Sequence, residues 1–246
     1  IMAVKYLDAK RIQGSSVGSR TLTWTFDLAS ATGSATNGEV GTDWVDSAPN
    51  TGCDISSGTL NWNMTRDTGH DNRIIYDLGS ALSDTSWVFR YKMTITALNN
   101  VTDGNGIQGA LLLTDLSNSY HNNTNADCVG LYTQAGNSNA HWNADYVTGF
   151  TAGSEAPRDG HNNGTDFAYA ISANDVVYVE IIRTSATSIT WNLYSDSGYS
   201  TLIESETESV SGITGLRYIR TFMGGDDDAQ ASTLSVSFDD IQIWDG

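Results

Sequence analysis

The chain has 246 residues, with 12 Lys and Arg against 29 Asp and Glu, which gives a formal net charge of -17. This charge argues against nucleic acid as a partner, because phosphate binding needs clustered Lys and Arg, and no apolar run is long enough for membrane insertion. Only 17% of the residues are charged, so Ser, Thr, Asn and Gly carry much of the polar surface, and this composition favours strands and turns.

An acidic surface is compatible with high-salt surroundings, with divalent cations, or with neutral or cationic ligands. It also serves simple solubility. The amino terminus lacks the basic-then-apolar layout of a signal peptide. The protein is therefore expected to be extracellular or on a virion surface, after removal of a leader or after leaving the cell by another route.

The first twenty residues differ from the rest of the chain. They hold four of the twelve basic residues and end in a Gly-rich and Ser-rich stretch, residues 14–19. We interpret residues 1–20 as an amino-terminal arm that attaches residues 21–246, a single domain, to other virion or surface proteins. The oligomeric state stays open.

From residue 21 onward the pattern has the period of two that is typical of half-buried strands. The segment Thr21–Leu28 places Leu22, Trp24, Phe26 and Leu28 on one predicted face. Further strands are predicted at Thr59–Thr65, Arg73–Leu78, Ser86–Leu98, Ile107–Thr114, Cys128–Gln134, Val176–Thr184, Ser188–Ser195, Tyr218–Met223 and Thr233–Trp244. No segment has the spacing and caps of a helix, so the fold class is all-β, a two-sheet antiparallel β-sandwich.

Three strand sequences carry a family resemblance: Trp87–Ile95, Val129–Tyr132 and Val236–Trp244. They resemble strands of concanavalin A-like and laminin G-like jelly rolls, which implies a lectin-like architecture. Separately, Met2–Gly14 resembles the openings of structural proteins from tailed viruses of marine microbes, which implies a virion-associated role.

A long region without a clear pattern, Asn137–Ala173, is expected to be a functional loop. Sugar binding needs an aromatic ring for the apolar face of the sugar and polar groups for its hydroxyls. This loop and a polar cluster before it supply the candidate ligand-binding residues: Trp142, Tyr146, His121, Asn123, Asp159, His161 and Asn162. The alternative is that the aromatic side chains only pin the loop to the sheet.

Structural calcium is the expected cofactor, because Ca²⁺ takes six to eight oxygen ligands, usually from loops. Asp226 and Asp228 follow two glycines in one acidic turn. The resemblance to sandwich carbohydrate-binding modules also implies Asp239 or Asp240 together with Asp27. The alternative is that each cluster is a solvated acidic turn.

No complete catalytic site is visible, so we expect that the protein is not an enzyme. The alternating acids of Glu204–Glu208 are interpreted as a surface turn. Alginate lyases of the same fold carry a tyrosine segment that Gly130–Gln134 resembles, yet Ile107–Ala110 lacks the histidine which that family needs. The two cysteines, Cys53 and Cys128, form either a disulfide or two free thiols.

These features favour a glycan-binding or adhesion module that contacts cell-surface carbohydrate and belongs to a virion. One alternative is a purely structural capsid or tail decoration protein. Another is a polysaccharide lyase or glycoside hydrolase.

Overall fold

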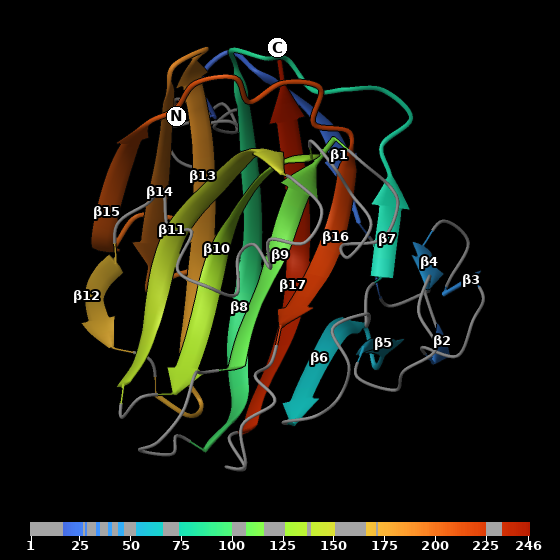
Figure 1. Cartoon of the computed structure of the whole chain (residues 1–246), viewed down its shortest axis with the longest axis vertical. Coiled ribbons are helices and arrows are strands. Elements are labelled where there is room, and N and C mark those ends of the chain that lie inside the picture. Colours follow the sequence, from blue (N-terminus) through green and yellow to red (C-terminus); the bar gives the residue numbers. More distant parts are fainter. Residues whose placement is uncertain are drawn as a thin grey trace, which may run out of the picture.

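The computed structural model describes most of the chain as strands of two sheets (Figure 1). The described residues are 17–26, 28, 33–34, 39–40, 44–46, 53–65, 74–99, 107–115, 126–136, 139–150, 166–170, 172–224 and 233–246. Within them no helix is long and apolar enough to cross a lipid bilayer. The predicted all-β antiparallel sandwich is confirmed.

Sheet A has nine strands in the spatial order β15-β14-β13-β8-β17-β6-β5-β2, with β1 also paired to β17. Its strands are β1 (Thr21–Thr25), β2 (Gly33–Ser34), β5 (Cys53–Ser56), β6 (Thr59–Thr65), β8 (Trp87–Asn99), β13 (Val176–Ser185), β14 (Ser188–Tyr194), β15 (Leu202–Ser209) and β17 (Thr233–Asp245).

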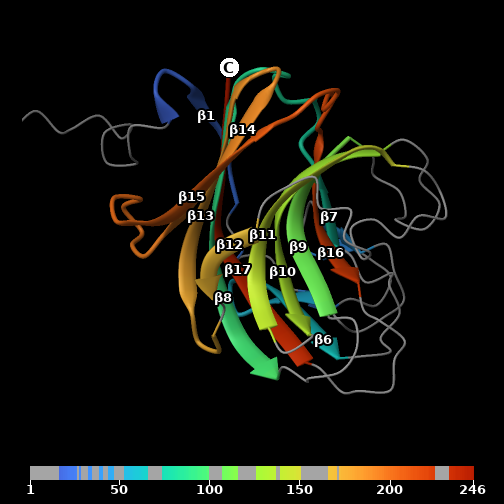
Figure 2. The same cartoon turned by 60° about the vertical axis from the view of Figure 1, so that its left-hand side comes forward.

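Sheet B has eight strands in the order β12-β11-β10-β9-β16-β7-β4-β3. Its strands are β3 (Glu39–Val40), β4 (Trp44–Asp46), β7 (Ile74–Asp77), β9 (Ile107–Thr114), β10 (Ala126–Gly136), β11 (Asn139–Phe150), β12 (Asp166–Ala170) and β16 (Tyr218–Gly224). Figure 2 shows the sheets as separate layers, with β8, β13 and β15 in one and β9, β10 and β11 in the other.

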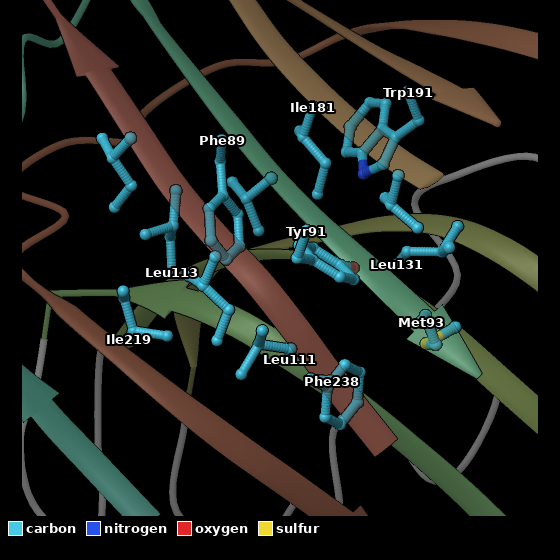
Figure 3. Close-up of a cluster of buried hydrophobic side chains, with 14 of the residues drawn as sticks. Phe89, Tyr91, Met93, Leu111, Leu113, Leu131, Ile181, Trp191, Ile219 and Phe238 are labelled. Atoms are coloured by element: carbon cyan, nitrogen blue, oxygen red, sulfur yellow. The ribbon is translucent and has the colours of Figure 1, made fainter. Parts of the chain in front are cut away.

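The core lies between the sheets, where alternate residues of each strand meet. Figure 3 shows Phe89, Tyr91 and Trp191 of sheet A beside Leu113 and Leu131 of sheet B. The prediction that Trp87, Phe89, Tyr91, Met93 and Ile95 share a buried face of one long strand is confirmed. At about 25 cal/mol per Å² of buried apolar surface, the burial of such faces between the two sheets is the main favourable contribution to folding.

The first predicted strand needs a correction. Leu28 is buried, but Leu22 is 41% exposed, although both were predicted on the buried face. The pairing of β1 with β17 shifts between Leu22 and Trp24, and this irregularity breaks the alternation.

A second irregularity divides the last strand, β17. Phe238 pairs with Leu60 of β6, whereas Gln242 pairs with Thr25 of β1. Strands β6 and β1 therefore lie one after the other along the same edge of β17. Asp240, with a φ of 51°, lies in the shift between these two halves. The amide of Phe26 donates to the carbonyl oxygen of Ile241 at 3.1 Å.

The segment just before β1 packs on the outer face of sheet A. Val17 is fully buried in a small apolar cluster with Val88, Ile182 and Trp244. The Arg20 guanidinium donates to Ser86 Oγ at 3.0 Å and to the carbonyl oxygen of Arg183 at 2.9 Å. Residues 17–20 therefore contact the sandwich, while the rest of the predicted arm lies outside the described residues.

Candidate functional site

The prediction of a long loop at Asn137–Ala173 is wrong, because β11 and β12 occupy most of the described part of it. In Figure 1, β9, β10 and β11 run side by side across the front of the molecule. Ala, Asn and Gly, which have low strand propensity, are frequent in β11 and hid its alternation from the sequence pattern.

The register of β11 against β10 decides which face each residue of β11 occupies. Trp142 is paired with Thr133, and Tyr146 with Val129. Thr133 is 1% exposed and Val129 is fully buried on the core side of β10. Directly opposed residues share a face of the sheet, so Trp142 and Tyr146 occupy core-facing positions, which agrees with the packing alternative.

The other predicted ligand-binding residues lie outside the described residues. These are His121, Asn123, Asp159, His161 and Asn162.

The opposite face of sheet B collects polar residue types from three neighbouring strands. One register row joins Gln108 of β9, Gln134 of β10 and His141 of β11. The next row joins Ala110, Tyr132 and Asn143. We name these six positions the polar rows. His141 lies in the segment that was predicted to be a loop, and the rows follow once β9, β10 and β11 are recognised as consecutive antiparallel strands.

A third row on the same face is closely packed. It joins Asp145, Gly130, Leu112 and Arg220 of β11, β10, β9 and β16. Leu112 is 1% exposed and Arg220 is 6% exposed. A Cβ atom on Gly130 would lie 2.2 Å from Leu112 Cδ2, so glycine is required for this close approach.

The outer face of sheet A holds a different polar cluster, built around a buried ion pair between Arg90 and Glu180. Arg90 Nε donates to Glu180 Oε2 at 2.6 Å, and both residues are essentially unexposed. Asn192 Nδ2 and the Tyr194 hydroxyl donate to Glu180 Oε1 at 3.0 and 3.1 Å. Burial, followed by the negative charge of Glu180, raises the pKa of Tyr194 to about 12.

A loop between β14 and β15 covers this ion pair. The Tyr199 ring lies 4.1 Å from the Arg90 guanidinium carbon, and Tyr199 has a φ of 51°. Asp196 holds the loop by accepting hydrogen bonds from the amides of Gly198, Ser200 and Thr201. Because Glu180 is satisfied by three side chains inside the protein, we assign this cluster to stabilising sheet A.

The acidic candidates are only partly described. Asp239 Oδ1 accepts a hydrogen bond from the amide of Asp240 at 2.8 Å, at the irregularity in β17. Asp27, Asp226 and Asp228 lie outside the described residues. Among the described residues, no group of three or more His, Cys, Asp and Glu side chains gathers closely enough to hold a metal ion.

The alternating glutamates form a strand, so their interpretation as a surface turn is wrong. Glu204, Glu206 and Glu208 lie in β15, the edge strand of sheet A. Glu204 accepts hydrogen bonds from the amides of Ala168 and Tyr169 at 2.9 and 2.8 Å, which links β15 to β12 of the other sheet. Burial and the two neighbouring glutamates raise the pKa of Glu206.

Both cysteines are free thiols. Cys53 is buried in sheet A, and its Sγ lies 3.6 Å from the Thr221 hydroxyl of sheet B, whereas Cys128 is half-buried in β10. Of the two alternatives for the cysteines, the structure therefore has the free thiols and not the disulfide.

No protein-family model matches the sequence, and no curated protein matches it either. Solved structures do match. The winged bean acidic lectin in complex with methyl-α-D-galactose is 12% identical, with a TM-score of 0.51 over 90% of this chain and 98% of the lectin. A structure reported for endo-acting O-glycanases with which human gut bacteria initiate mucin breakdown is 8% identical, with a TM-score of 0.51 over 92% of this chain and all of that one.

A marine alginate lyase of Zobellia galactanivorans is 10% identical, with a TM-score of 0.47 over 96% of this chain and 99% of the enzyme. The two matches with a TM-score of 0.51 and the order of the strands in the two sheets establish the fold class: this chain has a concanavalin A-like jelly roll. The resemblance noted in the sequence is thereby confirmed at the level of the fold, which lectins share with glycan-active enzymes.

Proposed function

We propose that this protein is a non-catalytic glycan-binding module that binds its ligand on the outer face of sheet B, over β9, β10 and β11. The observation that carries the proposal is the register that gathers Gln108, Gln134 and His141 in one row and Tyr132 and Asn143 in the next. Amide, imidazole and phenol groups hydrogen-bond sugar hydroxyls, and an aromatic ring packs against the apolar face of a sugar.

The fold alone does not decide the function, so the proposal rests on the residue types that the polar rows bring together. A site with few polar side chains per sugar binds a single glycan weakly. Several copies on one particle would supply the strength, because linked sites raise the effective concentration of the second binding event.

A glycan array probed with the chain on multivalent beads tests this function. We expect Tyr132→Ala and Asn143→Ala each to reduce binding at least about tenfold, or ~1.4 kcal/mol. Tyr132→Phe separates the ring from its hydroxyl. Thr207→Ala, on an exposed position of β15 in sheet A, is the control and should bind as the wild type does. Absence of binding at any multivalency, with folding intact by circular dichroism, refutes the function.

We also propose that the module acts outside the cell or on a virion surface and that its first twenty residues attach it to an assembly. Support comes from the resemblance of Met2–Gly14 to structural proteins of tailed viruses. The contacts of Val17 and Arg20 with sheet A fix the end of the predicted arm on the domain. Mass spectrometry of purified particles tests it, and absence of the chain from every particle fraction rules it out.

The alternative, a purely structural capsid or tail decoration protein, predicts that the polar rows are covered by a neighbouring subunit in the particle. Cryo-electron microscopy of the particle separates the two roles. Exposed polar rows favour glycan binding, and buried ones favour decoration.

Calcium is proposed as a structural ion at the irregularity of β17. Asp239 and Asp240 lie there, and the hydrogen bond from Phe26 brings the residue before Asp27 to the same place. After dialysis against a chelator, added Ca²⁺ should raise the melting temperature of the wild type and not that of Asp239→Asn. An equal rise in both proteins would exclude this site.

A second candidate function is glycoside hydrolysis, favoured by the raised pKa of Glu206 beside Glu204. Glycosidases pair a protonated acid with an ionised carboxylate. Glu204, however, already accepts hydrogen bonds from two β12 amides. Turnover of a neutral glucan that Glu206→Gln abolishes would establish hydrolysis.

Lyase chemistry has less support. The lyase resemblance requires a histidine in the segment Ile107–Ala110, but the residue opposite Tyr132 in this segment is Ala110.

A further inference from the structure

We infer that the glycan bound by the polar rows carries no carboxylate or sulfate groups. The inference rests on the proposed function and adds the chemical class of its ligand. Its basis is that aspartates lie beside the polar rows, whereas the described strands that form this side of sheet B contain no Lys or Arg.

The four strands at one side of sheet B contain no Lys or Arg. These strands are β12, β11, β10 and β9, and they include every position of the polar rows. In the eight strands of sheet B as the structure describes them, Arg220 is the single Lys or Arg. Binding surfaces for anionic sugars commonly contain Arg or Lys, because these side chains form strong charge-assisted hydrogen bonds with carboxylate and sulfate oxygens.

At the other side of the sheet, the two arginines that the structure describes are either buried or paired. Arg220 is 6% exposed in the packed third row. Arg217 forms a bidentate pair with Asp77, in which Nε and Nη2 donate to the two carboxylate oxygens at 2.7 and 2.8 Å. Neither side chain is therefore a ready counter-ion for a ligand on the polar rows.

Acidic residues border the polar rows instead. Asp166 of β12 is the register partner of Asn143, and Asp145 of β11 is the partner of Gly130 in the adjoining row. A ligand carboxylate here would meet like charges, which costs binding energy. Sugar hydroxyls and amino groups, in contrast, can donate hydrogen bonds to a carboxylate.

The net charge of -17 adds repulsion beyond the site. Such repulsion is screened over a distance of about 10 Å at 0.1 M salt. Binding of an anionic glycan should therefore strengthen as salt is added, whereas binding of a neutral glycan should depend little on salt.

The experiment compares hexasaccharides of equal length by titration calorimetry: one of mannose, one of N-acetylglucosamine, one of glucosamine and one of mannuronate. At 20 mM NaCl we expect at least one of the first three to bind at least about tenfold more tightly than the mannuronate oligomer. Raising NaCl to 300 mM should narrow this gap.

A charge variant makes the test local. Asp145→Lys should increase the affinity for the mannuronate oligomer several-fold relative to the wild type. The double variant Thr184→Lys with Ser197→Lys adds the same charge at an exposed position of β13 and at an exposed position of the loop between β14 and β15, and it should change that affinity much less.

The outcomes separate the two proposals. If no hexasaccharide binds and the array is also silent, the proposed function fails and the inference with it. If the mannuronate oligomer binds as tightly as the others at low salt, or if its binding weakens with added salt, the function stands and the inference is wrong. Equal gains in the two charge variants would also overturn it, because the effect would then come from net charge and not from sheet B.

Discussion

Trp191 and Gly130 connect the two sheets across the core: the indole Nε1 of Trp191, in β14 of sheet A, donates a hydrogen bond of 2.9 Å to the carbonyl oxygen of Gly130, in β10 of sheet B. Trp191 is fully buried. Gly130 lies two residues before Tyr132 on the strand that runs through the polar rows. Packing in sheet A therefore helps to position the central strand of the candidate site.

Replacing Trp191 by Phe should destabilise the protein by about 1–3 kcal/mol, because it removes this buried hydrogen bond and part of a fully buried side chain while keeping an aromatic ring in the core. Urea unfolding followed by circular dichroism measures the change. Trp24→Phe, at a half-buried position in β1, is the control and should cost less. Equal midpoints for the two variants would show that the hydrogen bond contributes little.

Gly130→Ala should destabilise by about 1–3 kcal/mol through overpacking. The new Cβ atom would lie 2.2 Å from Leu112 Cδ2 and 3.0 Å from the carbonyl oxygen of Leu111. Leu112 is buried and has little room to move. Combining Gly130→Ala with Leu112→Ala should cost less than the sum of the two single changes, since neighbouring sites are not additive. Strict additivity in urea unfolding would contradict the predicted clash.

The strands that the sequence predicted well are rich in β-branched and aromatic residues. β8 and β13 alternate large apolar side chains with polar ones, and their predicted and observed ends differ by at most one residue. β11 alternates too, but its small and polar residues have weak strand propensity, so the pattern was interpreted as a loop. β15 was missed because its alternating glutamates are typical of a solvated turn.

The candidate site was harder to predict than the fold, because it depends on register. Trp142 has the chemistry of a sugar-binding residue, yet its pairing with Thr133 puts it on the core side of sheet B. A shift of one residue would have reversed this assignment. The pairing of β9 with β16 joins segments about a hundred residues apart in sequence, and no local pattern specifies such a contact.

The Arg90–Glu180 and Arg217–Asp77 ion pairs should differ greatly in their contribution to stability. Glu180→Gln removes the charge partner of Arg90 inside a buried cluster and should cost about 3–5 kcal/mol. Asp77→Asn breaks the pair with Arg217, where both side chains are about 40% or more exposed, and should cost ~1 kcal/mol or less. Urea unfolding of both variants at pH 7 makes the comparison. Similar costs would mean that the Arg90 cluster is not a dry, tightly coupled site.

The half-buried carboxyl group of Asp115 should make the stability of the protein depend on pH, and the substitution Asp115→Asn should remove this contribution. Its carboxylate accepts a hydrogen bond from the amide of Asp127 at 2.8 Å, and burial, despite this hydrogen bond, raises the pKa of the carboxyl. A carboxyl whose pKa is higher in the folded than in the unfolded state binds more protons when folded, so its contribution to stability falls as pH rises from the unfolded value through the folded one. Asn keeps an oxygen acceptor and carries no charge.

The variant should therefore be more stable than the wild type at pH 7, by less than about 1 kcal/mol because the group is only half-buried. The difference should shrink as pH falls toward the ordinary pKa of an aspartate, where both proteins are neutral at this position. Melting temperatures of the two proteins between pH 3 and pH 8 provide the measurement. A difference that stays constant over this range would show that the effect of the substitution is steric and not electrostatic.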